Sequence, residues 1–358
     1  MAKNNHHYVP QFYLRLFGIN DKYIHLYNLK NKLHISEADI KHQCYKRKFY
    51  GKNDIVENAL AEIEQDCSIT IKEVIASKKL PLRNNPQYNH LLEFVAIQWL
   101  RTKSIVEEQT QTIESIARVV GNDFSEEFLD RLKNPEINLV LVSLSMAGII
   151  ERAIDDLEFH LVFSGAHRGF VTSDNPVVRY NLYNQSLSTI GMDGAVSKGI
   201  IFFLPLSPHY LLLLYDPGIY KLHNTGEVTY YANDKDIDYI NLLQFTFANE
   251  NIYFNDYVSK TAIDLLAKKS LQFRKGKRVD TKIFDEEGDP ERSSLLVTKN
   301  IIPNLHLDLS FLKIKSSARK IPYEMRINNS YRKDIPELGY EPPFSGPKLF
   351  KPREIVEK

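Results

Sequence analysis

The feature that most constrains the fold is a change of hydrophobic periodicity near residue 160. Before it, apolar residues recur at helical spacing, as Val56, Leu60 and Ile63 do. After it, short apolar runs such as residues 200–204 and 210–215 alternate with turn residues. This order predicts an α+β fold, in which a largely helical N-terminal half packs on a mostly antiparallel sheet.

The periodicity also predicts how the chain is divided. We expect helices over about residues 54–160 and the sheet over about residues 160–260, which together form a single α+β domain over residues 1–265. Residues 266–358 hold eight of the 16 prolines and several basic clusters. A Pro-rich, basic C-terminal extension that is peripheral to the core is therefore expected.

Three long helices are expected in the first half. One begins after Asp54 as its N-cap, the second covers residues 88 to about 120, and the third covers residues 137–159. A β-hairpin over residues 23–35 precedes them.

Composition excludes several classes of protein. Lys and Arg number 46 against 45 Asp and Glu, so a net charge of +1 draws the chain neither to polyanions nor to membranes. Cys44 and Cys67 are the two cysteines, and their spacing fits neither a disulfide scaffold nor a zinc ribbon. No apolar run follows the first residues, and residues 137–150 are too short to cross a bilayer, so no membrane association and a cytoplasmic location are expected.

The sequence lacks the common catalytic and nucleotide-binding motifs. It contains no G-x-G-x-x-G, H-E-x-x-H or G-x-S-x-G pattern. Residues 194–199 begin like a phosphate-binding loop, but Ile200 and Ile201 follow where Lys and Ser or Thr are required.

The most distinctive string is His-His-Tyr-Val-Pro-Gln-Phe-Tyr-Leu at residues 6–14. It resembles the opening of an uncharacterised prokaryotic family of unknown function. The resemblance continues to about residue 260 through Lys48-Phe49-Tyr50, Gln98, Arg101-Thr102, Thr172-Ser173-Asp174-Asn175-Pro176 and Pro205-Leu206-Ser207-Pro208. It implies a shared fold, and it supplies no mechanism.

The adjacent histidines of this string, His6 and His7, are candidate catalytic residues. A histidine can act as a general base or a metal ligand near neutral pH. The alternative is a surface pair without chemistry. Gln11, one helical turn after His7, is a candidate substrate contact.

Two carboxylates and an arginine are further candidates. Glu57 and Glu64 are seven residues apart at the border of an apolar helical stripe, so they either pair with a base or face a cleft as metal ligands. Gln98 and Arg101 lie on one side of an apolar helix, where the Arg101 fork suits phosphate or carboxylate. A structural Arg–Glu pair is the alternative for Arg101.

Asp174 and Asn175 follow an apolar strand and precede Pro176. An aspartate at the end of a strand is a common metal ligand or base, and it is equally a good turn former. The run from Lys268 to Arg278 is basic, and Phe273 within it offers a stacking surface. This run either follows a nucleic-acid backbone or is an ordinary solvated segment.

Two functions of different classes remain open. The first is phosphodiester hydrolysis, most simply by a metal-dependent nuclease of the bacterial toxin or phage-defence type that uses Mg²⁺ or Mn²⁺. Its catalytic residues would be His6, His7, Arg101 and Asp174, its metal ligands Glu57, Glu64 and Asp174, and its substrate contacts Gln11, Gln98 and Asn175.

The second function is a non-catalytic module that senses a ligand or binds a partner. Proximity distinguishes the two: catalysis requires His6 or His7, an acidic residue and Arg101 around one cleft. We expect the His6–His7 segment to pack against the helix that bears Gln98 and Arg101, near the loop that holds Asp174.

Overall fold

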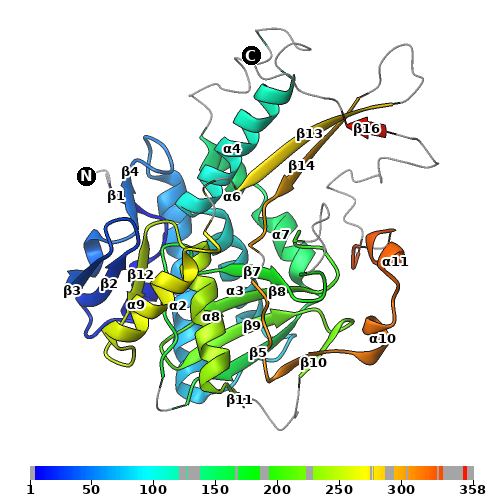
Figure 1. The fold of residues 1–358 in the computed structure, drawn as a ribbon. Helices are drawn as coiled ribbons and strands as arrows, with labels where there is room; N and C mark the ends of the chain where they lie inside the picture. Colours follow the sequence, from blue (N-terminus) through cyan, green and yellow to red (C-terminus); the bar gives the residue numbers. More distant parts are fainter. Residues whose placement is uncertain are drawn as a thin grey trace.

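A central sheet with helices on both faces dominates the computed structural model (Figure 1). The structure describes residues 5–120, 127, 138–165, 168–185, 193–222, 229–274, 276, 278–286, 294–303, 305–328, 330–333 and 350–352. The strand order of the central sheet is β11-β5-β9-β8-β7. Its strands are β5 (Glu158–Phe163), β7 (Val178–Asn181), β8 (Ile200–Pro205), β9 (Tyr210–Tyr215) and β11 (Thr229–Tyr231).

The central sheet is antiparallel except for the parallel pair β11 and β5. Its strands β8 and β9 are apolar and buried along their whole length, because both faces of the sheet are covered. Phe202 and Leu212 face one hydrophobic cluster, and Phe203 and Leu213 face another. The alternation of side chains along each strand therefore builds two cores from one sheet.

Helices cover one face of the central sheet. They are α2 (Ile55–Ser77), α3 (Pro86–Leu100), α6 (Leu139–Leu144) and α7 (Ala147–Ile154). The helix α4 (Lys103–Val120) follows α3 and extends beyond the sheet, where it packs against α6 and residues 279–286 (Figure 1). The other face is covered by α8 (Asp234–Phe247) and α9 (Lys260–Ser270), together with residues 305–318. This arrangement confirms the α+β class and the largely helical first half packed on a mostly antiparallel sheet.

A second sheet joins distant parts of the chain, with the strand order β3-β2-β12-β6. Its strands are β2 (Tyr23–Asn28), β3 (Leu33–Asp39), β6 (Thr172–Ser173) and β12 (Asn251–Phe254). The pair β2 and β3 confirms the hairpin expected over residues 23–35. Beside this sheet lie α1 (Gln11–Arg15), the 3-10 helix η1 (Ile40–His42) and the pair formed by β1 (Asn5–His7) and β4 (Tyr45–Arg47).

The helices differ from expectation at two places. The helix expected over residues 88–120 is broken at Arg101 and Thr102, because the Arg101 side chain enters the interior and Thr102 donates to Asn175. The helix expected over residues 137–159 is also wrong: α6 and α7 are separate, and residues 158–163 form β5. Ile137 itself lies outside the described residues.

The C-terminal region is part of the core. Leu305, Leu307, Leu309 and Phe311 are all at most 4% exposed and pack beneath the central sheet. The expectation of a peripheral extension is therefore wrong for residues 305–318. From Leu305 to Phe311 every second side chain is apolar and buried, and Leu312 and Ala318 are buried further on. The prolines at 290, 336, 342, 343 and 347 lie outside the described residues.

The remaining C-terminal elements are short. They are β13 (Val279–Glu286), β14 (Ser294–Asn300), β16 (Phe350–Pro352), the pair β10 (Tyr220–Leu222) and β15 (Leu312–Ile314), α10 (Ser316–Arg319) and α11 (Tyr323–Asn328). The hairpin of β13 and β14 extends along α4 (Figure 1). Further on, Arg332 is buried and donates to the Asp156 carboxylate and to three backbone carbonyl groups.

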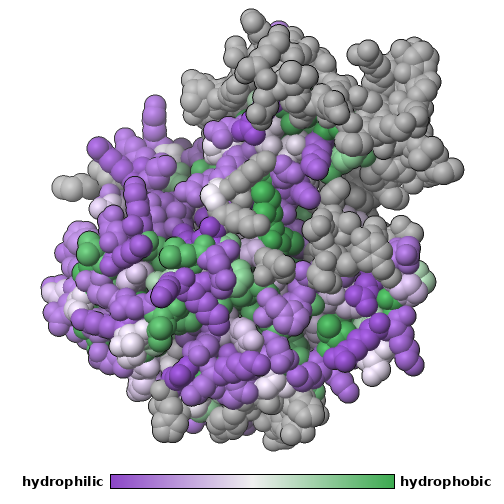
Figure 2. Space-filling view, in the orientation of Figure 1, coloured by the Kyte–Doolittle hydropathy of each residue, from purple (hydrophilic) through white to green (hydrophobic). Residues whose placement is uncertain are grey.

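The surface in the view of Figure 2 is mostly hydrophilic, with small hydrophobic patches between polar ones. Among the described helices, none combines the length and the apolar character that crossing a bilayer requires.

Two truncations test the role of the C-terminal region. A chain that ends after Ile335 keeps Arg332 and every buried residue named above, so its melting temperature should equal that of the full chain. A chain that ends after Ile302 loses Leu305, Leu307, Leu309 and Phe311, each worth about 1.5–3 kcal/mol, and also the buried Leu312 and Ala318. That loss is comparable with the whole stability of a domain, about 5–15 kcal/mol, so this chain should be insoluble.

The measurements are soluble yield and thermal melting followed by circular dichroism. Equal yield and melting temperature for the two truncated chains would mean that residues 305–318 do not support the core.

Candidate functional site

The two adjacent histidines have different environments, because successive residues of β1 face opposite sides. His6 is 1% exposed, and its ring is stacked on Tyr50 with the ring centroids 5.6 Å apart. Its Nδ1 accepts the Tyr50 backbone N–H at 3.0 Å, and its Nε2 lies 3.7 Å from Asp54 Oδ1. His6 therefore fixes the segment between β4 and α2 and is closed to substrate.

His7 is partly exposed, and its Nε2 lies 3.2 Å from the Lys41 carbonyl oxygen and 3.3 Å from the Gln11 side-chain nitrogen. Burial lowers the pKa of His7; the Glu64 carboxylate acts against this, and the charge of Arg101 reinforces it. His7 is therefore a neutral imidazole at neutral pH, which is the form that can take up a proton.

Arg101 is fully buried where α3 ends. Its Nη1 lies 2.6 Å from Glu64 Oε1, and its Nε donates to Gln98 Oε1 at 2.9 Å. Burial lowers the pKa of Arg101, but the charge and hydrogen bond of Glu64, together with Tyr50 and Glu57, outweigh it and hold that pKa above its usual value. Nη2 has no hydrogen-bond partner among the described residues.

Gln98 connects the Arg101–Glu64 ion pair to the N-terminal segment, because its Nε2 donates to the Tyr8 carbonyl oxygen at 3.0 Å. The N-terminal segment thus packs against α3. We call His7, Gln11, Glu64, Gln98 and Arg101 the N-terminal polar cluster. Glu57 lies two turns before Glu64 on α2, is partly exposed, and its charge also acts on Arg101.

Asp174 is 1% exposed and accepts three backbone N–H groups, from Asn249 at 2.7 Å, Glu250 at 2.7 Å and Asn251 at 3.0 Å. Burial raises the pKa of Asp174 to about 6, although these three hydrogen bonds act to lower it. The carboxylate holds the connection between α8 and β12, so its oxygens are engaged by the protein itself.

The metal ligands predicted at Glu57, Glu64 and Asp174 do not form a binding site. In the described part of the chain, no three His, Cys, Asp or Glu side chains gather as a group that could hold a metal ion. Glu64 is engaged by Arg101 and Asp174 by backbone amides.

Asn175, predicted as a substrate contact, joins three elements. Its Oδ1 accepts the Thr102 hydroxyl at 3.1 Å, and its Nδ2 donates to the Phe247 carbonyl oxygen at the end of α8 at 3.0 Å. It also lines a pocket that the sequence analysis did not predict.

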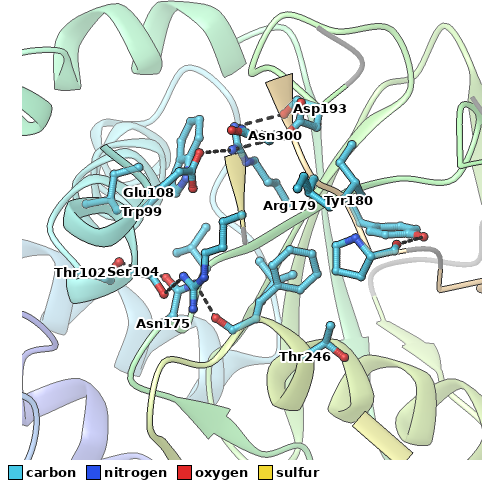
Figure 3. Close-up of a pocket in the computed structure, with 18 of the residues that line it drawn as sticks. Trp99, Thr102, Ser104, Glu108, Asn175, Arg179, Tyr180, Asp193, Thr246 and Asn300 are labelled. Atoms are coloured by element: carbon cyan, nitrogen blue, oxygen red, sulfur yellow. Dashed lines mark hydrogen bonds and ion pairs between the residues drawn. The ribbon is translucent and has the colours of Figure 1, made fainter. Parts of the chain in front are cut away.

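This pocket, which we call the junction pocket, lies where α3, α4, β7, the end of α8 and the base of the β13–β14 hairpin meet (Figure 3). Its empty volume, with the open mouth and adjoining solvent included, is about 960 Å³. The lining includes Trp99, Thr102, Ser104, Ile105, Glu108, Asn175, Val177, Arg179, Tyr180, Asp193, Thr246, Phe247, Phe273, Arg274, Arg278, Asn300, Ile301, Ile302 and Pro303.

One wall of the junction pocket carries the guanidinium group of Arg179 between two carboxylates. The Arg179 guanidinium lies 4.6 Å from the centroid of the Trp99 ring, and its Nη2 lies 3.3 Å from Glu108 Oε1 and 3.4 Å from Asp193 Oδ2. Figure 3 shows Trp99 and Glu108 on one side, Arg179 between them and Asp193, and Thr246 on the opposite side. Two carboxylates therefore face one guanidinium here, which leaves this wall with a net charge of −1.

A second wall carries two arginines with less compensation. Arg274 donates to three carbonyl oxygens at the end of α8, which neutralise no charge. Arg278 donates to the Ser104 hydroxyl at 2.9 Å, and its Nη2 lies 3.8 Å from Glu107 Oε2. Burial lowers the pKa of Arg274, and the neighbouring charge of Arg278 lowers it further. The charges of Asp174 and Glu107 act in the opposite sense. Within ion-pair distance, the described residues supply one carboxylate, Glu107, for these two guanidinium groups.

These positions change the interpretation of the run from Lys268 to Arg278. Its two arginines and Phe273 line the junction pocket, so the run does not present one continuous basic face. Lys268 and Lys269 belong to the last turn of α9, and Lys275 and Lys277 lie outside the described residues.

The fold and the two sites define an α+β protein with a buried polar cluster near its N-terminus and a pocket between its layers. The chain belongs to the family described as Protein of unknown function (DUF4238), whose model matches residues 5–257. Comparisons with curated proteins and with solved structures found no match. The family match ends before α9, so Phe273, Arg274, Arg278 and residues 300–303 of the pocket lining lie beyond it.

The geometry of Asp174 predicts a structural defect when it is replaced. Asp174→Ala leaves three buried backbone N–H groups without their acceptor, so the free energy of unfolding in urea should fall by about 2–4 kcal/mol. The control is Asp256→Ala, because the Asp256 side chain is 85% exposed and lies 3.0 Å from the His25 ring. Asp256→Ala should change the free energy of unfolding by no more than about 0.5 kcal/mol. Equal effects of the two substitutions would contradict the structural role of Asp174.

Proposed function

We propose that the protein is a non-catalytic module that binds a small organic anion in the junction pocket. The observation that carries this proposal is the pair Arg274 and Arg278, two adjacent guanidinium groups that face a pocket with apolar walls. A carboxylate or phosphate group would complement their charge, and the planar fork of Arg278 suits two oxygens.

The rest of the lining supports the same kind of ligand. Ile105, Val177, Phe247, Phe273 and Ile302 supply apolar surface for a flat or unsaturated part of the molecule. Glu108 and Asp193 together more than offset the charge of Arg179, so that wall disfavours a second anionic group. The ligand class that fits is a small molecule with an apolar body and one anionic end.

Trp99 makes this proposal testable, because it is the single tryptophan of the chain and it lines the pocket. Titration with benzoate, AMP or inorganic phosphate at millimolar concentration should change its fluorescence and raise the melting temperature. Adenosine, which lacks the anionic group, should act more weakly than AMP.

Arg278→Ala should weaken binding of the active probe by about tenfold or more, since a charge-assisted hydrogen bond is worth about 1.5–3 kcal/mol. The matched control is Arg168→Ala. Arg168 forms ion pairs with Asp234 and Asp238 and is absent from the pocket lining, so its loss should leave binding unchanged. If no anionic probe changes the fluorescence or the melting temperature, the proposal fails.

The phosphodiester hydrolase of the toxin or phage-defence type is the second candidate. One observation favours it: burial keeps His7 neutral, and the charges of Glu64 and Arg101 are close enough to act on its pKa. His7 would act as the base and Arg101 would stabilise the developing charge. Mg²⁺ or Mn²⁺ would have to be held largely by the substrate itself together with a carboxylate such as Glu57.

The test is cleavage of DNA and RNA with Mg²⁺ or Mn²⁺ by the protein and by His7→Ala. His7 is a base only when neutral, and burial places its pKa below the usual value of about 6.5. The cleavage rate should therefore be independent of pH around neutrality and fall at more acidic pH, where His7 becomes protonated. No cleavage, or equal cleavage by His7→Ala, would dismiss this candidate.

We also infer a cytoplasmic location. Cys44 and Cys67 are both buried free thiols, a state that a reducing compartment preserves.

A further inference from the structure

A basic segment lies next to the N-terminal polar cluster. Residues 41–53 contain Lys41, Lys46, Arg47, Lys48 and Lys52 and no acidic residue, although the whole chain has a net charge of only +1. All five side chains are exposed. Such a local excess of one sign attracts a polyanion even when the overall charge is close to zero.

These charges are largely uncompensated within the described part of the protein. The Lys41 ammonium lies 3.5 Å from Asp39 Oδ2. The described residues contain no acidic partner within ion-pair distance of the other four, and Lys46 lies over the ring of Phe49. Figure 2 shows hydrophilic side chains projecting at the upper left, where Figure 1 places β1 and β4.

A row of rings accompanies the charges. In the pair of β1 and β4, His7 faces Tyr45 and Asn5 faces Arg47, so these residues share one side of the ribbon. The His7 and Tyr45 ring centroids are 5.9 Å apart, and those of Tyr45 and His42 are 6.4 Å apart. His7 and Tyr45 are partly exposed and His42 is exposed.

We propose that this segment, which we call the basic ribbon (residues 41–48 with β1), binds single-stranded nucleic acid, with Tyr45 and Arg47 on one side of the strand pair and Lys46 at its other side. Lysine and arginine side chains would contact phosphates, and bases would stack on Tyr45 and His42. A single strand is favoured over a duplex because only unpaired bases expose their faces to aromatic side chains. The site is separate from the junction pocket, so this proposal does not rest on the proposed function.

The direct test is fluorescence anisotropy of the full chain with fluorescein-labelled oligo(dT), oligo(U) and a DNA duplex. Single strands should bind more tightly than the duplex. The logarithm of the affinity should fall with the logarithm of salt concentration, with a slope of about −0.7 for each phosphate contact. The fluorescence of Trp99 should stay unchanged, which separates this site from the junction pocket.

The backbone offers a variant that removes charge without strain. Lys48 has φ +52°, a left-handed conformation that glycine adopts more easily than lysine. Lys48→Gly should therefore keep the fold and make the salt slope smaller by about 0.7. Lys32→Gly is the matched control, because Lys32 is exposed, has φ +56° and lies in the turn between β2 and β3.

Stacking is tested by Tyr45→Ala, which should weaken binding by about tenfold, and Tyr45→Phe should restore it. Four outcomes would overturn the proposal: no binding of single strands, equal or tighter binding of the duplex, equal effects of Lys48→Gly and Lys32→Gly, or full affinity in Tyr45→Ala. Tighter binding to vesicles of anionic lipid than to nucleic acid would also overturn it.

Discussion

The ion pair of the buried Arg101 guanidinium with Glu64 is the interaction on which the positions of the N-terminal polar cluster and the junction pocket depend. A charge buried away from water needs an opposite charge and hydrogen-bond partners. Glu64 on α2 supplies the charge, and Gln98 on α3 accepts a hydrogen bond from Arg101. Gln98 also donates to the Tyr8 carbonyl oxygen. Arg101 lies at the break between α3 and α4. Because Arg101 turns to the N-terminal segment, Thr102 faces Asn175 on the other side, where the junction pocket begins.

Buried carboxylates play a comparable role elsewhere in the chain. Asp174 receives three backbone N–H groups between α8 and β12, and Asp236 receives the Ser310 backbone N–H and hydroxyl group. Irregular segments expose backbone groups that must find partners when they are buried. Polar residues that stand out in an apolar sequence are thus used here largely to hold irregular segments in place.

This use explains what the sequence could and could not predict. The fold class and the hairpin follow from periodicity, which reports burial directly. The break at Arg101 could not be predicted, because the helical pattern continues through it and the cause is a contact with Glu64 far along the chain. Apolar and polar residues alternate from Leu305 to Phe311, but the prolines on either side favoured the prediction of a loose extension. The junction pocket joins residues from 99 to 303, so no local pattern marks it.

The sheet formed by β2, β3, β6 and β12 has a consequence for synthesis of the protein. β2 pairs with β12 in a register that joins Asn28 to Asn251, so one edge of the hairpin stays unpaired until about 220 further residues have been made. At ribosomal rates this takes roughly 10 to 45 s. An open strand edge invites pairing with other nascent chains during that interval. The β2–β3 hairpin therefore keeps one edge open to intermolecular pairing until β12 has been synthesised.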